Sequence, residues 1–348
     1  MIDRSVSDRI AMLRFLMIAG IVVLHTPKYV PLAELGDGYF DFFKAFFQHA
    51  FFRTTVPVLT CISGYLVFKA NLDQQVGKLY TKKLRSLGIP FLVFNLGLLG
   101  VAYLAQAYLG VTTSVDLIPY DANTWLNAAF GWKTSPINYP LNFLRDLLAI
   151  ILITPLLGYL VRKAPMLGLL LVAVVFFKNF DGLLVLRPDM VVTFYVGALA
   201  AVYQWNLTKL DRFASALLVV FVGLCAAMVY FKVANSTYLR LVSPFLVWPA
   251  ASLLVNTAAG KWCMRMSRYS FFIFVTHSVI LLASWMVYQK VQTVVPYALY
   301  WFLTPVLTIA VLVVTYRMLM HVFPTITDFA LGNKPKPVGL VLPVPDKA

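Results

Sequence analysis

The first apolar run of the sequence carries two side chains that could do chemistry within a membrane, Arg14 and His25. A separation of eleven residues turns a helix by about 1100°, so the two side chains fall on nearly one face, roughly 16 Å apart along the axis. A charged group inside a bilayer costs at least about 2 kcal/mol, and it usually faces a protein interior or a watery cavity. The pattern predicts a substrate passage lined by this helix.

His25 stands directly before Thr26 and Pro27, where we expect the first helix to stop. A neutral imidazole in a partly dry site is the commonest general base for taking a proton from a hydroxyl group near neutral pH. The position alone fits equally well an interfacial histidine whose ring reaches the lipid headgroups. Arg14 is harder to explain as a bystander, because its guanidinium cannot lose its charge and must find an anion or polar groups.

Three cations, Lys82, Lys83 and Arg85, precede the third apolar run. Lys82 and Arg85 stand three residues apart, so on a helix they project together and could bind phosphate groups. A soluble phosphorylated donor would then enter at this end of the protein. The alternative is ordinary anchoring, because short cytoplasmic loops are rich in Lys and Arg.

Five further polar side chains are candidates for contacts with an acceptor or another part of the substrates. His49 and Arg53 open the second apolar run, on the side where His25 should emerge. Arg145 and Asp146 begin the fourth run, and because adjacent helical residues point about 100° apart, they need not pair with each other. Ion pairs between helices are the alternative role for both. His277, in the middle of the ninth run, is either catalytic or a core histidine bonded to a hydroxyl group.

The sequence predicts no metal site. Its four histidines are dispersed and its three cysteines are scattered, without the spacing of metal ligands. We expect the cysteines to be reduced thiols that act as small apolar side chains. No G-x-S-x-G, Walker or G-x-G-x-x-G motif occurs. The residues alone therefore indicate a cationic passage with a candidate base at the outer end and a basic mouth at the inner end.

The composition is that of a membrane protein. Hydrophobic residues make up 61% of the 348 residues and charged residues 12%, and the mean hydropathy is +0.80. These values exclude a soluble globular domain. The formal charge of +15 arises from small basic groups between apolar runs. Such groups indicate membrane topology and lipid headgroups rather than nucleic acid.

We expect an all-α polytopic protein with about ten transmembrane helices, because a spanning helix needs about 20 mostly apolar residues. The predicted spans, of which the fifth and sixth are short, lie near Ile10 to Leu24, Ala50 to Phe68, Leu87 to Leu109, Leu141 to Val161, Met166 to Phe177, Met190 to Tyr203, Phe213 to Phe231, Leu241 to Val255, Tyr269 to Tyr288 and Tyr297 to Met320. The first run has no small-residue cleavage site and carries Arg14, so we expect it to remain as a span rather than to be removed as a signal peptide.

The distribution of Lys and Arg predicts that both termini are cytoplasmic. With this orientation the inner side receives about 17 of these residues and the outer side about 9, in agreement with the enrichment of cations in cytoplasmic loops. Residues 1–324 are expected to form a single transmembrane domain. Residues 325–348, with their Lys-Pro repeats, are expected to form an extended cytoplasmic tail.

Several motifs, in this order, resemble the acyltransferase 3 family of integral membrane O-acyltransferases over about Ser7 to Pro324. They are Arg14 with ten residues before His25, Ile62-Ser-Gly-Tyr-Leu after Pro57, Lys82-x-x-Arg85 before Ile89-Pro-Phe, Tyr139-Pro-Leu-Asn-Phe-Leu-Arg-Asp-Leu with Pro155 closing it, and Ser270 to His277. The segment from Arg53 to Asn95 is most similar to the rhizobial type that adds succinyl or acetyl groups to exopolysaccharide. The sequence departs from the family at Met320-His-Val-Phe-Pro324, where many members have a Glu before the Pro, and at Asn142, where many have Trp.

The resemblance implies transfer of an acyl group from cytoplasmic acyl-CoA to a sugar hydroxyl of an extracytoplasmic polysaccharide or its lipid-linked precursor. It places the protein in the bacterial inner membrane, assigns catalytic roles to Arg14 and His25, and assigns donor binding to Lys82 and Arg85. Acyl-CoA would be a co-substrate, with no permanently bound cofactor. A succinyl group would bring a carboxylate that needs a cation near the outer site, for which Arg53 or Arg145 is a candidate. A secondary transporter or sugar-lipid flippase is the alternative, since charges in spanning helices are expected there too.

Overall fold

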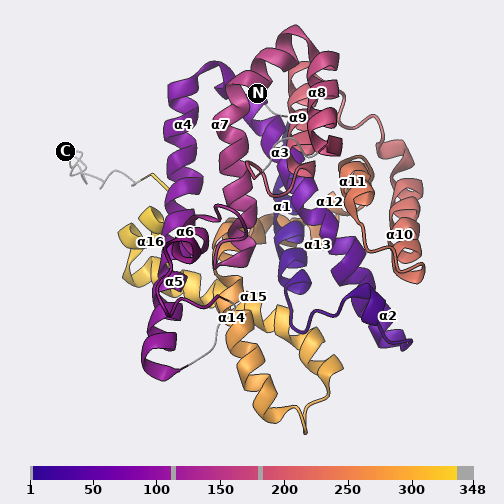
Figure 1. Cartoon of the computed structure of the whole chain (residues 1–348). Coiled ribbons are helices and arrows are strands. Elements are labelled where there is room, and N and C mark those ends of the chain that lie inside the picture. Colours follow the sequence, from indigo (N-terminus) through magenta and orange to yellow (C-terminus); the bar gives the residue numbers. More distant parts are fainter. Residues whose placement is uncertain (1–2, 111–114, 179–182, 335–348) are drawn as a thin grey trace, which may run out of the picture.

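The computed structural model describes residues 3–110, 115–178 and 183–334, and within these ranges the chain is helical and contains no β-strand. Figure 1 shows the helices gathered into one bundle. The helices are α1 (Arg4–Leu24), α2 (Tyr39–Ala45), α3 (Thr55–Lys69), α4 (Val76–Lys83), α5 (Ile89–Leu109), α6 (Ala122–Phe130), α7 (Asn142–Lys163), α8 (Pro165–Lys178), α9 (Asp189–Val202), α10 (Ala214–Tyr230), α11 (Thr237–Ala250), α12 (Ser252–Val255), α13 (Ala258–Met266), α14 (Ser270–Val291), α15 (Tyr297–Val322) and α16 (Pro324–Ala330). The all-α class predicted from the sequence is confirmed.

Seven continuous helical stretches are long and apolar enough to cross a membrane, and each coincides with a predicted span. They are Tyr39–Lys69, Val76–Leu109, Tyr139–Lys163, Asp211–Tyr230, Thr237–Val255, Ala258–Val291 and Tyr297–Val322. The remaining three predicted spans correspond to α1, which has 21 residues and carries Asp8, Arg9 and Arg14, and to the shorter apolar helices α8 and α9, of 14 residues each. The protein is thus a multi-pass membrane protein, while the count of ten spans and the cytoplasmic position of the termini stay predictions.

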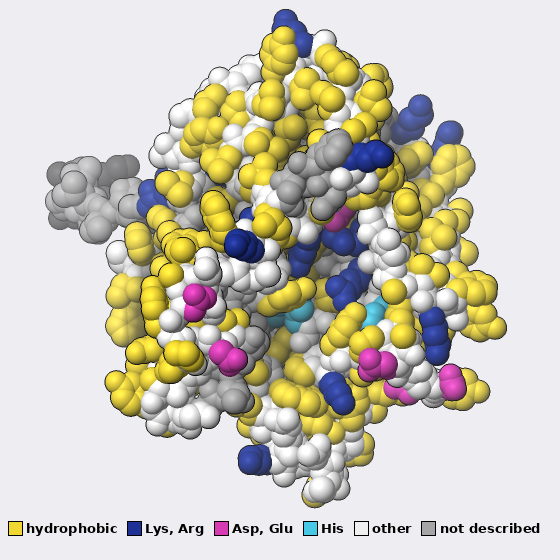
Figure 2. Space-filling model, in the orientation of Figure 1, with side chains coloured by type: hydrophobic (Ala, Val, Ile, Leu, Met, Phe, Trp, Pro, Cys, Tyr) yellow, Lys and Arg dark blue, Asp and Glu magenta, His cyan; other side chains and the backbone are white. Residues whose placement is uncertain are grey.

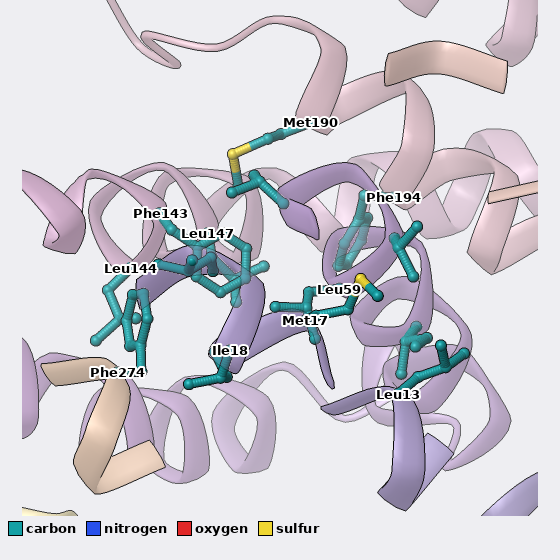
Figure 3. Packing of buried hydrophobic residues seen from close by; sticks show 14 of the residues in the cluster. Leu13, Met17, Ile18, Leu59, Phe143, Leu144, Leu147, Met190, Phe194 and Phe274 are labelled. Carbon is teal, nitrogen blue, oxygen red and sulfur yellow. The ribbon is translucent and has the colours of Figure 1, made fainter. Parts of the chain in front are cut away.

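Helix α1 lies in the middle of the bundle (Figure 1), where it packs against α3, α13, α14 and α15. Leu13, Met17 and Ile18 of α1 are buried in one cluster with Leu59 of α3 and Phe274 of α14 (Figure 3). Lipid is as apolar as these side chains, so close packing and internal hydrogen bonds hold such a helix in place more than the hydrophobic effect does. A long central helix held in this way can carry functional groups at two fixed levels of the bundle.

Two glycines allow α3 and α9 to cross in backbone contact. A Cβ atom at Gly64 would collide with the carbonyl group of Phe194, and one at Gly197 would collide with the carbonyl group of Cys61. Small residues at helix crossings permit this close approach in membrane proteins. The crossing fixes the short helix α9, and with it Asp189 at its first position, against the core of the bundle.

The end of the chain is only partly covered by the structure. The sequence predicted an extended tail from residue 325, but residues up to Ala330 form α16, which contacts α5. The carbonyl group of Asn333 accepts a hydrogen bond from Arg85 at 3.0 Å. Pro324 provides the reason for the new helix, because proline is favoured in the first turn, where its missing N–H is not needed. The Lys-Pro repeats from residue 335 onward lie outside the described residues.

Candidate active site

His25 caps the C-terminal end of α1 and lies against His277 of α14. Their ring atoms Nδ1 of His25 and Nε2 of His277 are 3.1 Å apart, and the two rings are stacked with their centroids at 5.3 Å. The residues are 252 positions apart in the sequence. Tyr139 contacts His25 on another side, edge to face at 5.7 Å. The tertiary fold thus brings together the catalytic candidate and a histidine that the sequence left without a definite role.

The hydrogen bonds of His277 fix which nitrogen atoms carry hydrogen. Its Nδ1 faces the carbonyl oxygens of Ile273 and Phe274 at 3.1 and 2.8 Å. Carbonyl oxygens can only accept, so Nδ1 of His277 must donate, and in the neutral ring Nε2 is then an acceptor. His25 therefore donates from Nδ1 to His277. The Nε2 atom of a neutral His25 keeps its lone pair, which is the form a general base needs.

A second set of contacts fixes the end of α1 next to His25. The side-chain amide of Gln48 donates to the carbonyl oxygen of Thr26 at 2.8 Å and to those of Val23 and Leu24 at 3.3 and 3.4 Å. Leu24 is the last residue of α1, where backbone carbonyl groups have no partner further along the helix. Gln48 is only 1% exposed. The helix ends at Leu24, as the following Thr26-Pro27 predicted, and the amide of Gln48 keeps that end rigid.

His25 lines a cavity of about 80 Å³ together with three arginines, Arg53, Arg187 and Arg240. Figure 2 shows Lys or Arg and His side chains around a hollow in the middle of this face of the molecule. A volume of this size holds a few water molecules or one small polar group. The site therefore combines a candidate base with several permanent cations. Among the sequence candidates, Arg53 and His25 line this cavity.

Arg187 and Arg240 were missed as site residues by the sequence interpretation, which counted both as outer-side topological charges. Arg240 lies on α11 and pairs with Asp189, the first residue of α9, at 2.6 Å. Arg187 lies two residues before α9 and close enough to both Asp189 and Arg240 for charge interactions. The available signal was the Arg187-Pro-Asp189 sequence before one apolar run and Arg240 directly before another.

Arg145 and Asp146 form a structural brace beside the cavity. The two side chains pair with each other at 2.9 Å, although their adjacent positions on a helix did not require it. Arg145 also donates to the carbonyl groups of Gly131, Leu183 and Leu184 at 3.0, 2.6 and 2.5 Å. The fully buried Asp146 accepts from the N–H of Leu186 at 3.0 Å. The pair thereby holds the segment that presents Arg187.

His49 anchors the loop that follows α1. Its Nε2 lies 2.8 Å from the carbonyl oxygen of Val30, so Nε2 carries the hydrogen, and Nδ1 accepts from the hydroxyl group of Tyr29 at 3.3 Å. Arg53 reaches over the ring of Tyr29, with 5.5 Å between its guanidinium carbon and the ring centroid. Both ring nitrogens of His49 are used within the protein. His49 is not among the residues that line the cavity, and its contact with an acceptor stays a prediction.

Arg14 lies in a second cationic group, at another level of the bundle. Its side chain is exposed despite its position in the centre of α1. Both Arg14 and Lys82 are close enough to the half-buried Lys83 to interact with its charge. Arg85 lies in the π-helical turn Leu84–Gly88, and one of its guanidinium nitrogens donates a hydrogen bond to the carbonyl oxygen of Asn333. The structure thus places Lys83, which stands between the donor-binding candidates Lys82 and Arg85 in the sequence, near enough to Arg14 for a charge interaction.

The comparisons with known proteins show the family to which this helix bundle belongs. A family model described as an acyltransferase domain matches residues 8–317. The chain belongs to the acyltransferase 3 family. The resemblance predicted from the motifs is therefore confirmed, and this member of the acyltransferase 3 family is a membrane-embedded acyltransferase.

The acyltransferase 3 protein described here is also similar to the succinoglycan biosynthesis protein ExoH of Rhizobium meliloti (strain 1021). The two are 32% identical over 349 residues, which cover 95% of this chain and 94% of the relative. No solved structure matches the chain. Within residues 3–110, 115–178 and 183–334, no group of three or more His, Cys, Asp or Glu side chains is arranged to hold a metal ion.

Proposed function

We propose that this acyltransferase moves an acetyl or succinyl group from cytoplasmic acyl-CoA to a sugar hydroxyl of an extracytoplasmic exopolysaccharide or its lipid-linked precursor, in the bacterial inner membrane. The observation that carries the proposal is the 3.1 Å contact between Nδ1 of His25 and Nε2 of His277, from which we infer that Nε2 of a neutral His25 keeps its lone pair. The relative of known role acts in the biosynthesis of succinoglycan. That role supports a polysaccharide acceptor for this protein.

In the proposed reaction, Nε2 of His25 takes the proton of the sugar hydroxyl as the oxygen attacks the carbonyl carbon of the thioester. The carbon–sulfur bond then breaks, and the proton passes from His25 to the departing thiolate of CoA. The bond to Nδ1 of His25 keeps the ring oriented through both proton transfers. A thioester is already activated, so direct attack needs no acyl group on the histidine.

Donor binding is assigned to the group of Arg14, Lys82, Lys83 and Arg85. Coenzyme A carries several phosphate groups, and Arg and Lys side chains bind them by charge-assisted hydrogen bonds. In the proposed orientation this group faces the cytoplasm, where acyl-CoA is made. The pantetheine arm would extend along α1 from Arg14 toward His25, which lies roughly 16 Å further along the helix axis.

The test is acyl transfer in proteoliposomes that contain the purified protein, labelled acyl-CoA and the polysaccharide acceptor. Wild-type protein is expected to cleave the thioester only when acceptor is present, and His25→Ala to lower turnover by about 10²-fold or more. His321→Ala is the matched control, because His321 is exposed near the end of α15. Normal turnover by His25→Ala would remove this residue from the mechanism. Movement of a sugar lipid or a small anion without thioester cleavage would instead indicate the transporter or flippase.

A further inference from the structure

We infer that Arg53, Arg187 and Arg240 form a carboxylate-binding site that selects acyl donors whose acyl group itself ends in a carboxylate. The three guanidinium groups come from different parts of the fold. Arg53 lies in the short helical turn Phe51–Thr54, Arg187 before α9, and Arg240 on α11. All three line the cavity that also contains His25. The inference rests on the proposed function and adds the chemical class of the group transferred.

The cavity carries more positive charge than its own carboxylates balance. Arg240 pairs with Asp189 at 2.6 Å and Arg145 with Asp146 at 2.9 Å. Arg53 uses only Nε in a hydrogen bond, to the carbonyl oxygen of Gln48 at 3.1 Å. Within the part of the chain that the structure describes, neither Arg53 nor Arg187 has a carboxylate at ion-pair distance, although Asp146 and Asp189 are near enough to interact with the charge of Arg187. Four arginines therefore stand against two carboxylates, which leaves a net balance of two positive charges.

These charges repel one another at short range. Arg53 and Arg187 both interact electrostatically with Arg240 and with His25. Placing like charges together in a partly desolvated cavity is unfavourable, and a bound anion relieves this cost through charge-assisted hydrogen bonds. The planar guanidinium of Arg187, which makes no hydrogen bond within the described residues, is suited to bidentate binding of a carboxylate. The arrangement is that of an anion-binding site.

The position beside the base decides which anion fits. The phosphate groups of CoA lie far from the thioester, because the pantetheine arm separates the two. We have proposed that the cations around Lys82 bind these phosphates. An acetyl group brings no charge. The terminal carboxylate of a succinyl group lies only two methylene groups from the carbonyl carbon that reacts, so it must be held next to His25 during attack. A small cavity lined by arginines satisfies that requirement. Arg145, the other arginine predicted to bind a succinyl carboxylate, does not, because its guanidinium group is already bonded to Asp146 and to three carbonyl groups.

A carboxylate could also come from the acceptor polysaccharide, and the experiment separates the two sources by changing the donor alone. Turnover of succinyl-CoA and acetyl-CoA is measured with one acceptor for wild type, Arg187→Gln and Arg187→Lys. We expect Arg187→Gln to lower succinyl transfer relative to acetyl transfer by about tenfold or more. Arg187→Lys should recover part of the ratio, since it restores the charge without the planar fork. Arg317→Gln, which removes an arginine bonded to Tyr269, should leave the ratio unchanged.

Each outcome bears on the inference separately from the proposed function. If Arg187→Gln lowered turnover equally with succinyl-CoA and acetyl-CoA, the donor assignment would be overturned. The arginines would then bind a carboxylate of the acceptor or the negative charge that develops on the reacting oxygen. An unchanged rate with both donors would overturn the anion site altogether. If Arg187→Gln fails to accumulate in the membrane, the same ratio is measured with Arg53→Gln. Absence of thioester cleavage by the wild-type protein with either donor would instead contradict the proposed function.

Discussion

The two cationic regions of this protein differ in how firmly their side chains are held. Around His25, the ring is fixed by His277, the end of α1 by Gln48, and Arg240 by Asp189 at 2.6 Å. Around Arg14, the cations are exposed or half-buried, with few internal partners. Groups that carry out chemistry gain from being held in one geometry, whereas long, mobile cations suffice to capture a phosphorylated ligand. The difference supports the proposal that the first region carries out the chemistry and the second captures the donor.

The largest effect on the proposed separation of chemistry from donor capture is expected when the contact between His25 and His277 is removed. We expect His277→Leu to lower turnover by about 10²-fold, with little change in the KM for acyl-CoA, because the ring would lose the bond that sets its tautomer. His277→Gln should recover part of the loss, since its side-chain oxygen can accept from Nδ1 of His25. Steady-state kinetics across a pH series measures both variants.

A merely structural role of His277 would give a different pattern. Leu and Gln would then reduce the amount of folded protein alike, and the pH dependence of the remaining activity would match that of the wild type. Such a result would mean that His277 contributes to the packing of the protein and not to catalysis. Thermal unfolding of each variant in detergent provides the necessary control.

A smaller effect is expected from the exposed region. Lys82→Gln and Arg85→Gln should each raise the KM for acyl-CoA by about threefold to tenfold, with turnover at saturating donor preserved, because exposed cations contribute modest binding energy. The effect should shrink at high salt, which screens exposed charges. Donor titrations at low and high ionic strength check this. A fall in saturated turnover without a change in KM would contradict the role in donor capture.

The sequence predicted the helices better than their contacts. Hydropathy located α1. The following Thr26 and Pro27 located its end at Leu24, because the residue before a proline disfavours helical geometry. It also located the short helix α9, although 14 residues gave a weak signal. These features depend on neighbouring residues, so a single sequence contains the information needed.

The site was predicted in part, because much of it is tertiary. His25 was identified from its place at the end of an apolar run, but its partner His277 is 252 positions away. Arg187 and Arg240 had the pattern of topological charges, and only the packing of α9 and α11 brings them to one cavity. Arg14 and His25 were predicted to line one passage because they share a helix. The structure places them in separate groups of residues, and a passage between these groups stays a prediction.

The most direct measurement is a structure of the protein bound to a non-hydrolysable thioether analogue of acyl-CoA. The account predicts that the phosphate groups lie against Lys82 and Arg85, and that the carbon atom corresponding to the thioester carbonyl lies beside Nε2 of His25. An analogue bound with its acyl end away from His25, or with its phosphates away from these cations, would contradict the account.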